Sequence, residues 1–214
     1  MRQISLPDWL TWIDKNLKWL SIPKLPLLLT IIQALGFIFT YEKPEFVFRL
    51  VLDPNAVLRG EIWRIFTFIA IPLVSNPILV LFVLCFLYYI MVELESIWGA
   101  TLLTVYFLLA WFCSVLAAIL IGIPIETFFY MELSFFFALA TLNPNRTIYL
   151  FFILPIAFKW IAVFTAIVLF ASPLFLYSFP QLLYIILLFA NYLIFFGKDY
   201  WLRFKKEFDK RKKI

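Results

Sequence analysis

The chain has no histidine, and this absence removes much of the chemistry that enzyme sites normally use. Ser–His and Cys–His pairs are excluded within these 214 residues, as are most zinc and haem sites, because each of them needs an imidazole. The two cysteines, Cys85 and Cys113, stand inside apolar runs and are interpreted as small hydrophobic residues rather than a disulfide or metal ligands. We therefore expect neither a cofactor nor a bound metal ion.

Charged residues are also scarce, at 14% of the chain, whereas soluble domains contain about 25%. With 65% apolar residues, the chain lacks the polar surface of a water-soluble globule, which excludes a cytosolic enzyme and a disordered chain. Glycine is rare as well, at 5 residues, so packing between helices is expected to depend on bulky rings such as the 27 phenylalanines. The composition predicts an all-α, polytopic membrane protein.

Residues 5–20 have the pattern of an amphipathic helix. Ser5 and Asp8 form a Ser-x-x-Asp capping signal, with Pro7 near the first turn. One helical face collects the large apolar side chains, namely Trp9, Trp12, Ile13, Leu17 and Leu20. We predict that residues 1–24 form an N-terminal interfacial helix with its tryptophans at headgroup level. The segment lacks the unbroken apolar stretch and the small-residue cleavage site of a signal peptide.

Six apolar segments follow, each close to the ~20 residues that cross a bilayer. Their approximate ranges are 25–41, 77–96, 101–122, 125–142, 147–170 and 173–196. The one long connection, residues 42–76, is too apolar for a solvated loop and too interrupted for a span, so we expect short helices at the membrane interface. Residues 25–197 are therefore interpreted as one membrane domain, followed by a basic tail over residues 198–214.

Lysine and arginine predict the orientation of the chain. If all six segments cross the membrane, most of the 18 basic residues fall on one side, in the N-terminal segment, the connection between the fourth and fifth spans, and the tail. Both termini are therefore predicted to be cytoplasmic, and the chain is interpreted as a multi-pass protein of a bacterial inner membrane. The tail is expected to contact anionic lipid headgroups rather than nucleic acid.

A sequence motif stands in the long connection after the first span. Gly60, Trp63, Arg64 and Thr67 form the pattern Gly-x-x-Trp-Arg-x-x-Thr. Together with the six-span layout and the cytoplasmic termini, this motif resembles the rhomboid superfamily over residues 25–197, and the resemblance implies a six-helix rhomboid-like bundle. In physical terms, the Trp63 ring suits the outer interface, and Arg64 can reach phosphate groups or loop carbonyls.

The end of the second span carries another part of the resemblance. Glu95-Ser-Ile-Trp-Gly99 is similar to the Glu-x-x-x-Gly of the family, although Met91 stands where the family usually has a further glycine. A negative charge near a helix C-terminus is unfavourable, so we expect the Glu95 carboxylate to accept hydrogen bonds from nearby backbone or indole groups. Gly99 is expected to end the helix. Residues 155–160 fit a Pro/Lys-Trp signature of the family.

The resemblance implies a serine protease site, but its central parts are missing. Rhomboid proteases use a serine in Gly-x-Ser-Gly on the fourth span and a histidine on the sixth. Here the motif aligns with residues 131–134, so the nucleophile position is Leu133, or Ser134 after a one-residue slip, and both glycines are lost in either register. Because the sixth span has no histidine, a serine would lack its base. We therefore predict an inactive pseudoprotease.

Two charged residues, Glu132 and Lys159, stand inside predicted spans. An unpaired charge at the centre of a span costs about 2.5–3.5 kcal/mol, so we predict an ion pair between them. In one alternative, Lys159 extends to the cytoplasmic interface. In another, a desolvated Lys159 acts as the base for Ser134. Asn191, a polar residue in the sixth span, is expected to hydrogen-bond a neighbouring helix.

Three classes of function follow from these observations. Inactive rhomboid relatives bind transmembrane clients in quality control or trafficking, and the resemblance implies the same here, with a lateral groove between the second and fifth spans as the binding place. An intramembrane protease with a Ser134–Lys159 dyad is the enzymatic alternative. A small transporter or channel is the third, which repeats or several charges at membrane depth would favour.

Overall fold

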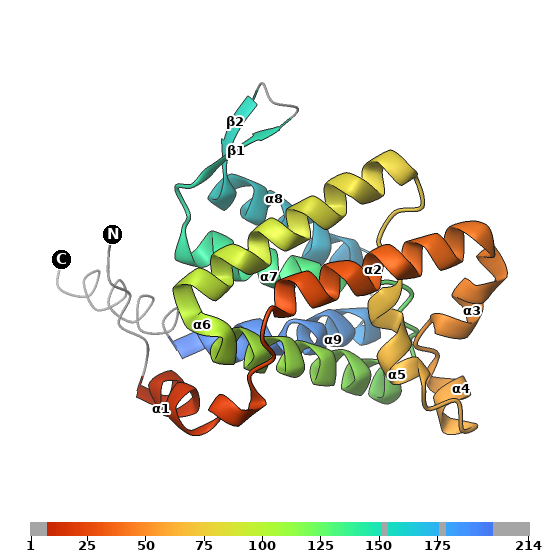
Figure 1. Ribbon diagram of the computed structural model, residues 1–214. Coiled ribbons are helices and arrows are strands. Elements are labelled where there is room, and N and C mark those ends of the chain that lie inside the picture. The colour runs from red at the N-terminus through yellow and green to blue at the C-terminus, as the bar shows by residue number, and fades with distance from the viewer. Residues whose placement is uncertain (1–7, 151–153, 176–178, 199–214) are drawn as a thin grey trace.

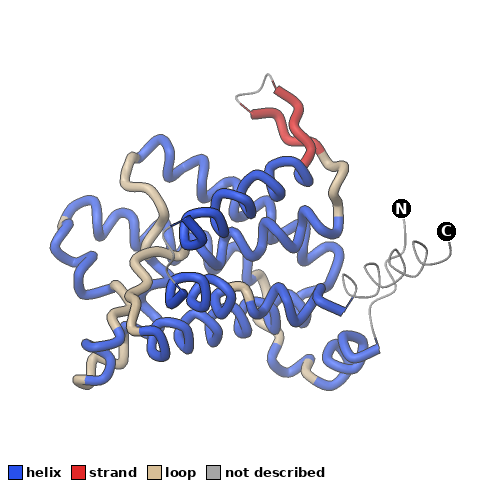
Figure 2. Tube along the Cα trace, turned by 180° about the vertical axis from the view of Figure 1, so that it is seen from behind, coloured by secondary structure: helices blue, strands red, loops and turns tan. Residues whose placement is uncertain are grey.

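The computed structural model describes residues 8–150, 154–175 and 179–198, and this part of the chain is almost entirely helical (Figure 1). The helices are α1 (Asp8–Asn16), α2 (Leu25–Glu42), α3 (Val47–Leu50), α4 (Pro54–Leu58), α5 (Arg64–Thr67), α6 (Pro77–Ile121), α7 (Phe129–Leu142), α8 (Phe158–Phe175) and α9 (Phe179–Leu188). Two short strands, β1 (Thr147–Leu150) and β2 (Leu154–Ala157), form a hairpin that projects from the bundle (Figure 2).

The described part of the predicted N-terminal helix is present as α1, whereas Ser5 and Pro7 of its predicted cap, like the basic tail beyond residue 198, lie outside the described residues. Trp9 and Ile13 on this helix, and Leu17 just after it, pack against the protein core, and the Trp9 ring meets the Phe195 ring edge to face at a centroid distance of 5.5 Å. Trp12, which the sequence places on the same face, is 59% exposed. The apolar face of α1 is thus divided between the bundle and the surroundings of the protein.

α6 contains two of the predicted segments. Asn76 caps its first turn by accepting hydrogen bonds from the amides of Ile78 and Leu79. At Gly99 the backbone has φ 80° and ψ 163°, which is not helical. The chain reverses direction there, so the first and second halves of α6 form a helical hairpin (Figure 1). The prediction that Gly99 ends the second segment is therefore confirmed.

Several helices are apolar enough for a membrane. Lys18–Glu42 and Pro77–Ile121 are long enough to cross one, and a third crossing is available if Phe179–Leu188 and Ala190–Lys198, which meet at 66°, form one span. Phe129–Leu142 and Phe158–Ala171 are shorter. Bulky apolar side chains face outward on these helices, as expected for a surface in contact with lipid. The helical fold class is confirmed, and two or three candidate membrane-spanning helices agree with the predicted membrane protein, whereas six separate spans remain a prediction.

The fifth predicted segment, 147–170, is only partly helical. Residues 147–150 pair with 154–157 in an antiparallel hairpin, and α8 begins at Phe158. Pro155 accounts for this difference, because it has no amide hydrogen and disfavours a helical conformation in the residue before it. The surrounding β-branched and aromatic residues also favour strands.

The long connection consists of short helices, as predicted, and it is anchored at two points. Leu52 exchanges two backbone hydrogen bonds with Ile125, at 3.1 and 3.0 Å, so the fourth segment starts as a bridge and α7 begins only at Phe129. Gly36 on α2 approaches the 3₁₀ turn at residues 68–70 so closely that a Cβ would lie 1.8 Å from the Ala70 carbonyl oxygen.

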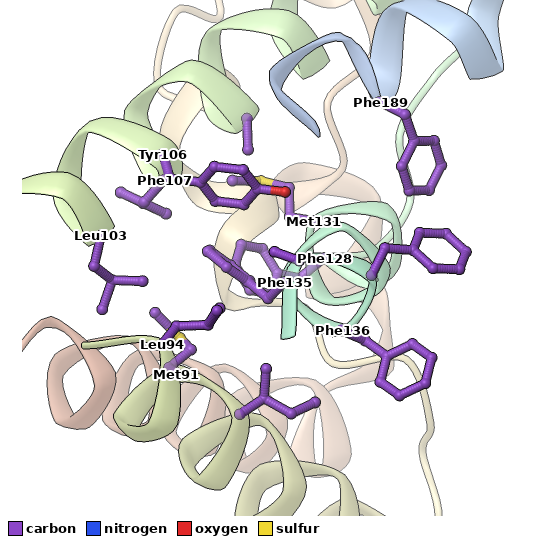
Figure 3. Close-up of a cluster of buried hydrophobic side chains, with 14 of the residues drawn as sticks. Met91, Leu94, Leu103, Tyr106, Phe107, Phe128, Met131, Phe135, Phe136 and Phe189 are labelled. Carbon is purple, nitrogen blue, oxygen red and sulfur yellow. The ribbon is translucent and has the colours of Figure 1, made fainter. Parts of the chain in front are cut away.

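The largest buried side chains gather between α6 and α7 (Figure 3). Tyr106 on the second half of α6 packs against Phe135 at a centroid distance of 5.7 Å, and Phe135 packs against Phe128 at 6.5 Å. Met91 and Leu94 from the first half of α6 are buried in the same cluster. Both halves of α6 therefore help to bury α7, and the core depends on bulky rings as the composition predicts.

Candidate functional site

A buried polar cluster joins three helical segments of the bundle. The Ser134 hydroxyl on α7 lies 2.7 Å from the Tyr106 hydroxyl and accepts a hydrogen bond from Asn191 Nδ2 at 2.8 Å. The Tyr106 hydroxyl also donates to the Ser134 carbonyl oxygen at 3.0 Å. All three residues are fully buried. The prediction that Asn191 hydrogen-bonds a neighbouring helix is confirmed.

This cluster holds Ser134 without a base. One placement of the protons satisfies all three contacts: Tyr106 donates to the Ser134 carbonyl, Asn191 donates to Ser134 Oγ, and Ser134 donates to the phenol oxygen. An amide is not basic, and a serine becomes a good nucleophile only beside a group that takes its proton. The contacts give Ser134 a structural role in joining α6, α7 and the helix Ala190–Lys198, which contains Asn191. The sequence does not single out Tyr106, although a buried tyrosine usually needs a partner for its hydroxyl.

Lys159 lies far from these groups. Its Nζ donates to Asn145 Oδ1 at 3.0 Å and stands 5.6 Å from the centre of the Trp160 ring, and the side chain is exposed. The proposed dyad between Ser134 and Lys159 is therefore not formed. The exposure agrees with the alternative in which Lys159 extends to the membrane surface.

The predicted ion pair between Glu132 and Lys159 is also wrong, because α8 begins later than predicted. The backbone amide of Lys159 donates to the Pro144 carbonyl at 3.2 Å, so Lys159 lies beside the C-terminal end of α7. Glu132 is in the first turn of the same helix. At 1.5 Å per residue, Glu132 and Leu142 at the end of α7 are separated by about 15 Å. A single lysine side chain does not span that distance.

Glu132 instead lines a groove between the first half of α6 and α8, which we call the α6–α8 groove. The groove has a volume of about 200 Å³. Its walls and floor include Val83 and Leu87 from α6, Glu132 and Leu133 from α7, and Ile161 and Thr165 from α8. Leu133, a candidate nucleophile position, is thus an apolar part of the floor. Ser134 lies outside the lining.

The polar atoms around Glu132 are incompletely paired. Glu132 Oε1 is buried without a hydrogen-bond partner, and so are both polar side-chain atoms of Gln33 on α2. Gln33 is fully buried next to the Glu132 carboxyl. The sequence does not single out Gln33, although a lone amide in an apolar helix is itself an unusual feature. Buried polar groups in native proteins normally have partners, so this place in the groove needs an explanation.

A second cavity, of about 390 Å³, lies between α7, α8, α9 and the helix Ala190–Lys198. Its lining is mostly apolar, with Lys159 at one end and the hydroxyls of Thr141 and Tyr192, 2.7 Å apart, in its wall. The Ser134 cluster lines neither this cavity nor the α6–α8 groove. Within the described residues, the serine is thus enclosed by packed side chains.

The motif in the long connection holds that connection together. Arg64 Nη1 donates to the carbonyl oxygens of Phe48 and Val51 at 2.6 and 2.9 Å, and Thr67 Oγ1 donates to the Leu50 carbonyl at 3.0 Å. The prediction that Arg64 reaches loop carbonyls is confirmed, and lipid phosphate is not needed to satisfy it, since the residue is 7% exposed.

Two other motif residues occupy the turn before Arg64. Gly60 has φ 106°, in a region that favours glycine, and the neighbouring Glu61 carboxylate pairs with Arg64 at 2.7 Å. Trp63 is 52% exposed, which agrees with the prediction of an interfacial ring. The motif is therefore a local structural unit of the connection.

The carboxylate that anchors the end of the second segment is Glu93 rather than Glu95. Glu93 forms a two-pronged ion pair with Arg146, at 2.5 and 2.8 Å, while the described residues provide no hydrogen bond to the Glu95 side chain. The Arg146 guanidinium also lies over the Tyr89 ring at 5.3 Å. The hydrogen bonds that Arg146 donates to the Glu93 carboxylate raise the pKa of Arg146, so Arg146 stays charged. Spacing along the sequence does not reveal this pair, because its members are on different segments.

Comparison with known proteins adds no relative. No protein-family model, curated protein or solved structure matches the chain. The rhomboid resemblance therefore rests on the sequence motifs.

Proposed function

We propose that this protein is a rhomboid-like pseudoprotease that binds transmembrane segments of client proteins in the α6–α8 groove without cutting them. The observation that carries this proposal is the groove itself, which is formed by the second and fifth apolar segments and contains one carboxylate, Glu132. A client helix can approach it sideways from the lipid, since outward-facing side chains on both flanking helices, such as Phe82 and Phe164, are apolar.

Contacts within the bundle support a six-span, rhomboid-like arrangement. Trp98 at the end of the second segment and Trp9 on α1 both pack against Phe195, with centroid distances of 5.4 and 5.5 Å. The Glu93–Arg146 pair ties the connection between the fourth and fifth segments to the same end of α6. Six crossings place all of these parts on one side of the membrane. An odd number of crossings would place the two termini of the chain on opposite sides.

The buried cluster supports the relationship to a proteolytic ancestor. Ser134 and Asn191 belong to the fourth and sixth apolar segments, which carry the serine and the histidine in rhomboid proteases. Asn191 follows Ala190, in the way the histidine follows an alanine in the Ala-His-x-x-Gly run of the family, although Ile194 stands where that run has its glycine. The two side chains contact each other at 2.8 Å. An amide in the place of an imidazole supports a site that has kept its contact and lost its base.

The alternatives have less support. A Ser134–Lys159 protease needs two side chains that lie at different ends of α7 to meet. A transporter needs several polar groups along a route, whereas Glu132 is the one ionisable side chain in the lining of the groove.

Photocrosslinking in reconstituted vesicles tests the proposal. A photoreactive amino acid replaces Thr165, which lines the groove, or Phe164, the adjacent residue of α8, which is 69% exposed and lies outside the lining. We expect tagged single-span peptides with a polar residue at their centre to form more adduct from position 165 than from position 164. Equal yields would argue against the groove as the binding place.

A cleavage assay with the same peptides tests the pseudoprotease assignment. We expect no cleavage by the purified protein. Cleavage that Ser134→Ala abolishes would overturn the assignment, and the Lys159→Met variant would then show whether Lys159 supplies the base.

A further inference from the structure

The α6–α8 groove contains an acceptor that the described part of the chain leaves unpaired. Glu132 Oε1 is buried and has no hydrogen-bond partner, and the neighbouring Gln33 does not satisfy it. A polar atom that lies at membrane depth without a hydrogen-bond partner is strongly unfavourable. Buried polar atoms in native proteins normally have partners, so an unpaired carboxyl oxygen here favours an interaction with a group outside the described residues.

No basic side chain of the described residues neutralises Glu132. Arg64 is paired with Glu61, Arg146 is paired with Glu93, and Lys159 bonds Asn145 at the other end of α7. The groove lining contains no lysine or arginine. A partner that enters the groove can therefore supply the positive charge that the lining lacks next to Glu132.

The size of the groove limits what that donor can be. A cavity of about 150 Å³ is enough to hold benzene. The α6–α8 groove, at about 200 Å³, is therefore too small for a helix but large enough for one long side chain. The apolar stem of a lysine or arginine can pack against Leu87, Leu133 and Ile161 while its charged end reaches Glu132.

We propose that the α6–α8 groove selects transmembrane helices that carry a lysine or arginine within the membrane, and that Glu132 binds this basic group. This inference rests on the proposed function and names its partner class. Lysine and arginine carry only donors, which match a bare acceptor, and a hydrogen bond between two charged groups is about twice as strong as one between neutral groups. Pairing also relieves the cost of both buried charges. A client helix fits this description when its basic residue is not paired with an acidic residue of another helix.

The experiment uses the full-length protein in vesicles, with the photoreactive residue in place of Thr165. Four single-span, leucine-rich peptides share the same ends and differ only at the central residue, which is lysine, asparagine, leucine or glutamate. We expect the lysine peptide to give about tenfold more adduct than the leucine and glutamate peptides. Glu132→Gln is expected to remove that preference. Glu126→Gln, which removes an exposed carboxylate six residues earlier, is expected to leave it unchanged.

The outcomes separate this inference from the proposed function. Equal adduct with the lysine and asparagine peptides, or a lysine preference that survives Glu132→Gln, would refute the basic partner while leaving the groove as a client site. Adduct no greater from position 165 than from position 164 with any peptide would refute both. The peptide series on the protein with an intact Glu132 decides the matter even if Glu132→Gln fails to fold.

Discussion

Individual polar residues in the interior of this protein are held in two ways. Ser134 shares hydrogen bonds with Tyr106 and Asn191 and is satisfied within the chain. Glu132 and Gln33 are buried with polar atoms that the described residues do not pair, and Asn191 Oδ1, beside Ser134, is unpaired as well. Hydrogen bonds such as those of Ser134 stabilise the bundle, whereas each unpaired buried polar atom destabilises it.

The Ser134 cluster predicts a stability effect. Ser134→Ala leaves Asn191 Nδ2 and the Tyr106 hydroxyl short of a buried partner, so we expect the free energy of unfolding in detergent to fall by about 1–3 kcal/mol. Client crosslinking from position 165 should persist, since Ser134 does not line the groove. Ser96→Ala, which removes an exposed hydroxyl, is the control, with an expected change within about 0.5 kcal/mol. An unchanged stability for Ser134→Ala would contradict the role of the cluster.

Gly36 provides a second prediction for a single residue. In Gly36→Ala the new Cβ would meet the Ala70 carbonyl oxygen at 1.8 Å, and both groups belong to backbone that cannot rotate away. We expect a loss of about 1–3 kcal/mol or more as α2 moves away from the 3₁₀ turn. Thermal unfolding monitored by circular dichroism measures it. A Cβ at Gly197 meets nothing within 4 Å, so Gly197→Ala should not destabilise the protein.

At the scale of single elements, the apolar runs predict most helices but not where each begins. A run such as residues 147–157 contains β-branched and aromatic residues in an uninterrupted apolar stretch, and periodicity does not distinguish a strand from a buried helix there. The hairpin shifts the start of α8, and that shift removes the predicted Glu132–Lys159 pair. The roles of Arg64, Gly99 and Asn191 are predictable because each residue is unusual where it stands: a cation among apolar residues, a glycine between two apolar segments, and an amide within an apolar segment. The Glu93–Arg146 pair is not predictable in this way, because its two residues are far apart in the sequence and meet only in the folded bundle.

The bend of α6 gives a prediction that depends on the type of backbone conformation. Gly99 combines φ 80° with ψ 163°, a region that is essentially limited to glycine, whereas Gly122 has φ 77° and ψ 15°, which asparagine also adopts. A Cβ at either position meets nothing within 4 Å, so only backbone strain differs. We expect Gly99→Asn to destabilise the protein by about 1–3 kcal/mol and Gly122→Asn by clearly less. Chemical denaturation of both variants measures the difference, and equal losses would contradict the prediction.

At the scale of the whole molecule, contacts between distant segments define two ends of the bundle. Trp9, Trp98 and Phe195 meet at one end. At the other end, Leu52 pairs with Ile125 through backbone hydrogen bonds. In the six-span arrangement the first end is cytoplasmic, in agreement with the basic residues of the sequence, and the second end faces the outside.

This arrangement predicts which loops are reached from each side of the membrane. In a background with Cys85→Ala and Cys113→Ala, single cysteines are introduced as Asn16→Cys, Asn145→Cys or Asn55→Cys, all at exposed positions. A membrane-impermeant maleimide is applied to vesicles of either orientation.

Six crossings require that positions 16 and 145 are labelled from the same side and position 55 from the opposite side. The reason is that residues 16 and 55 are separated by the first span, and residues 16 and 145 by four spans. Labelling of all three positions after detergent treatment controls for access. If positions 55 and 145 react from the same side, the chain crosses the membrane in a different order, the first half of α6 and α8 no longer flank a lateral opening of the rhomboid kind, and the proposed function fails with it.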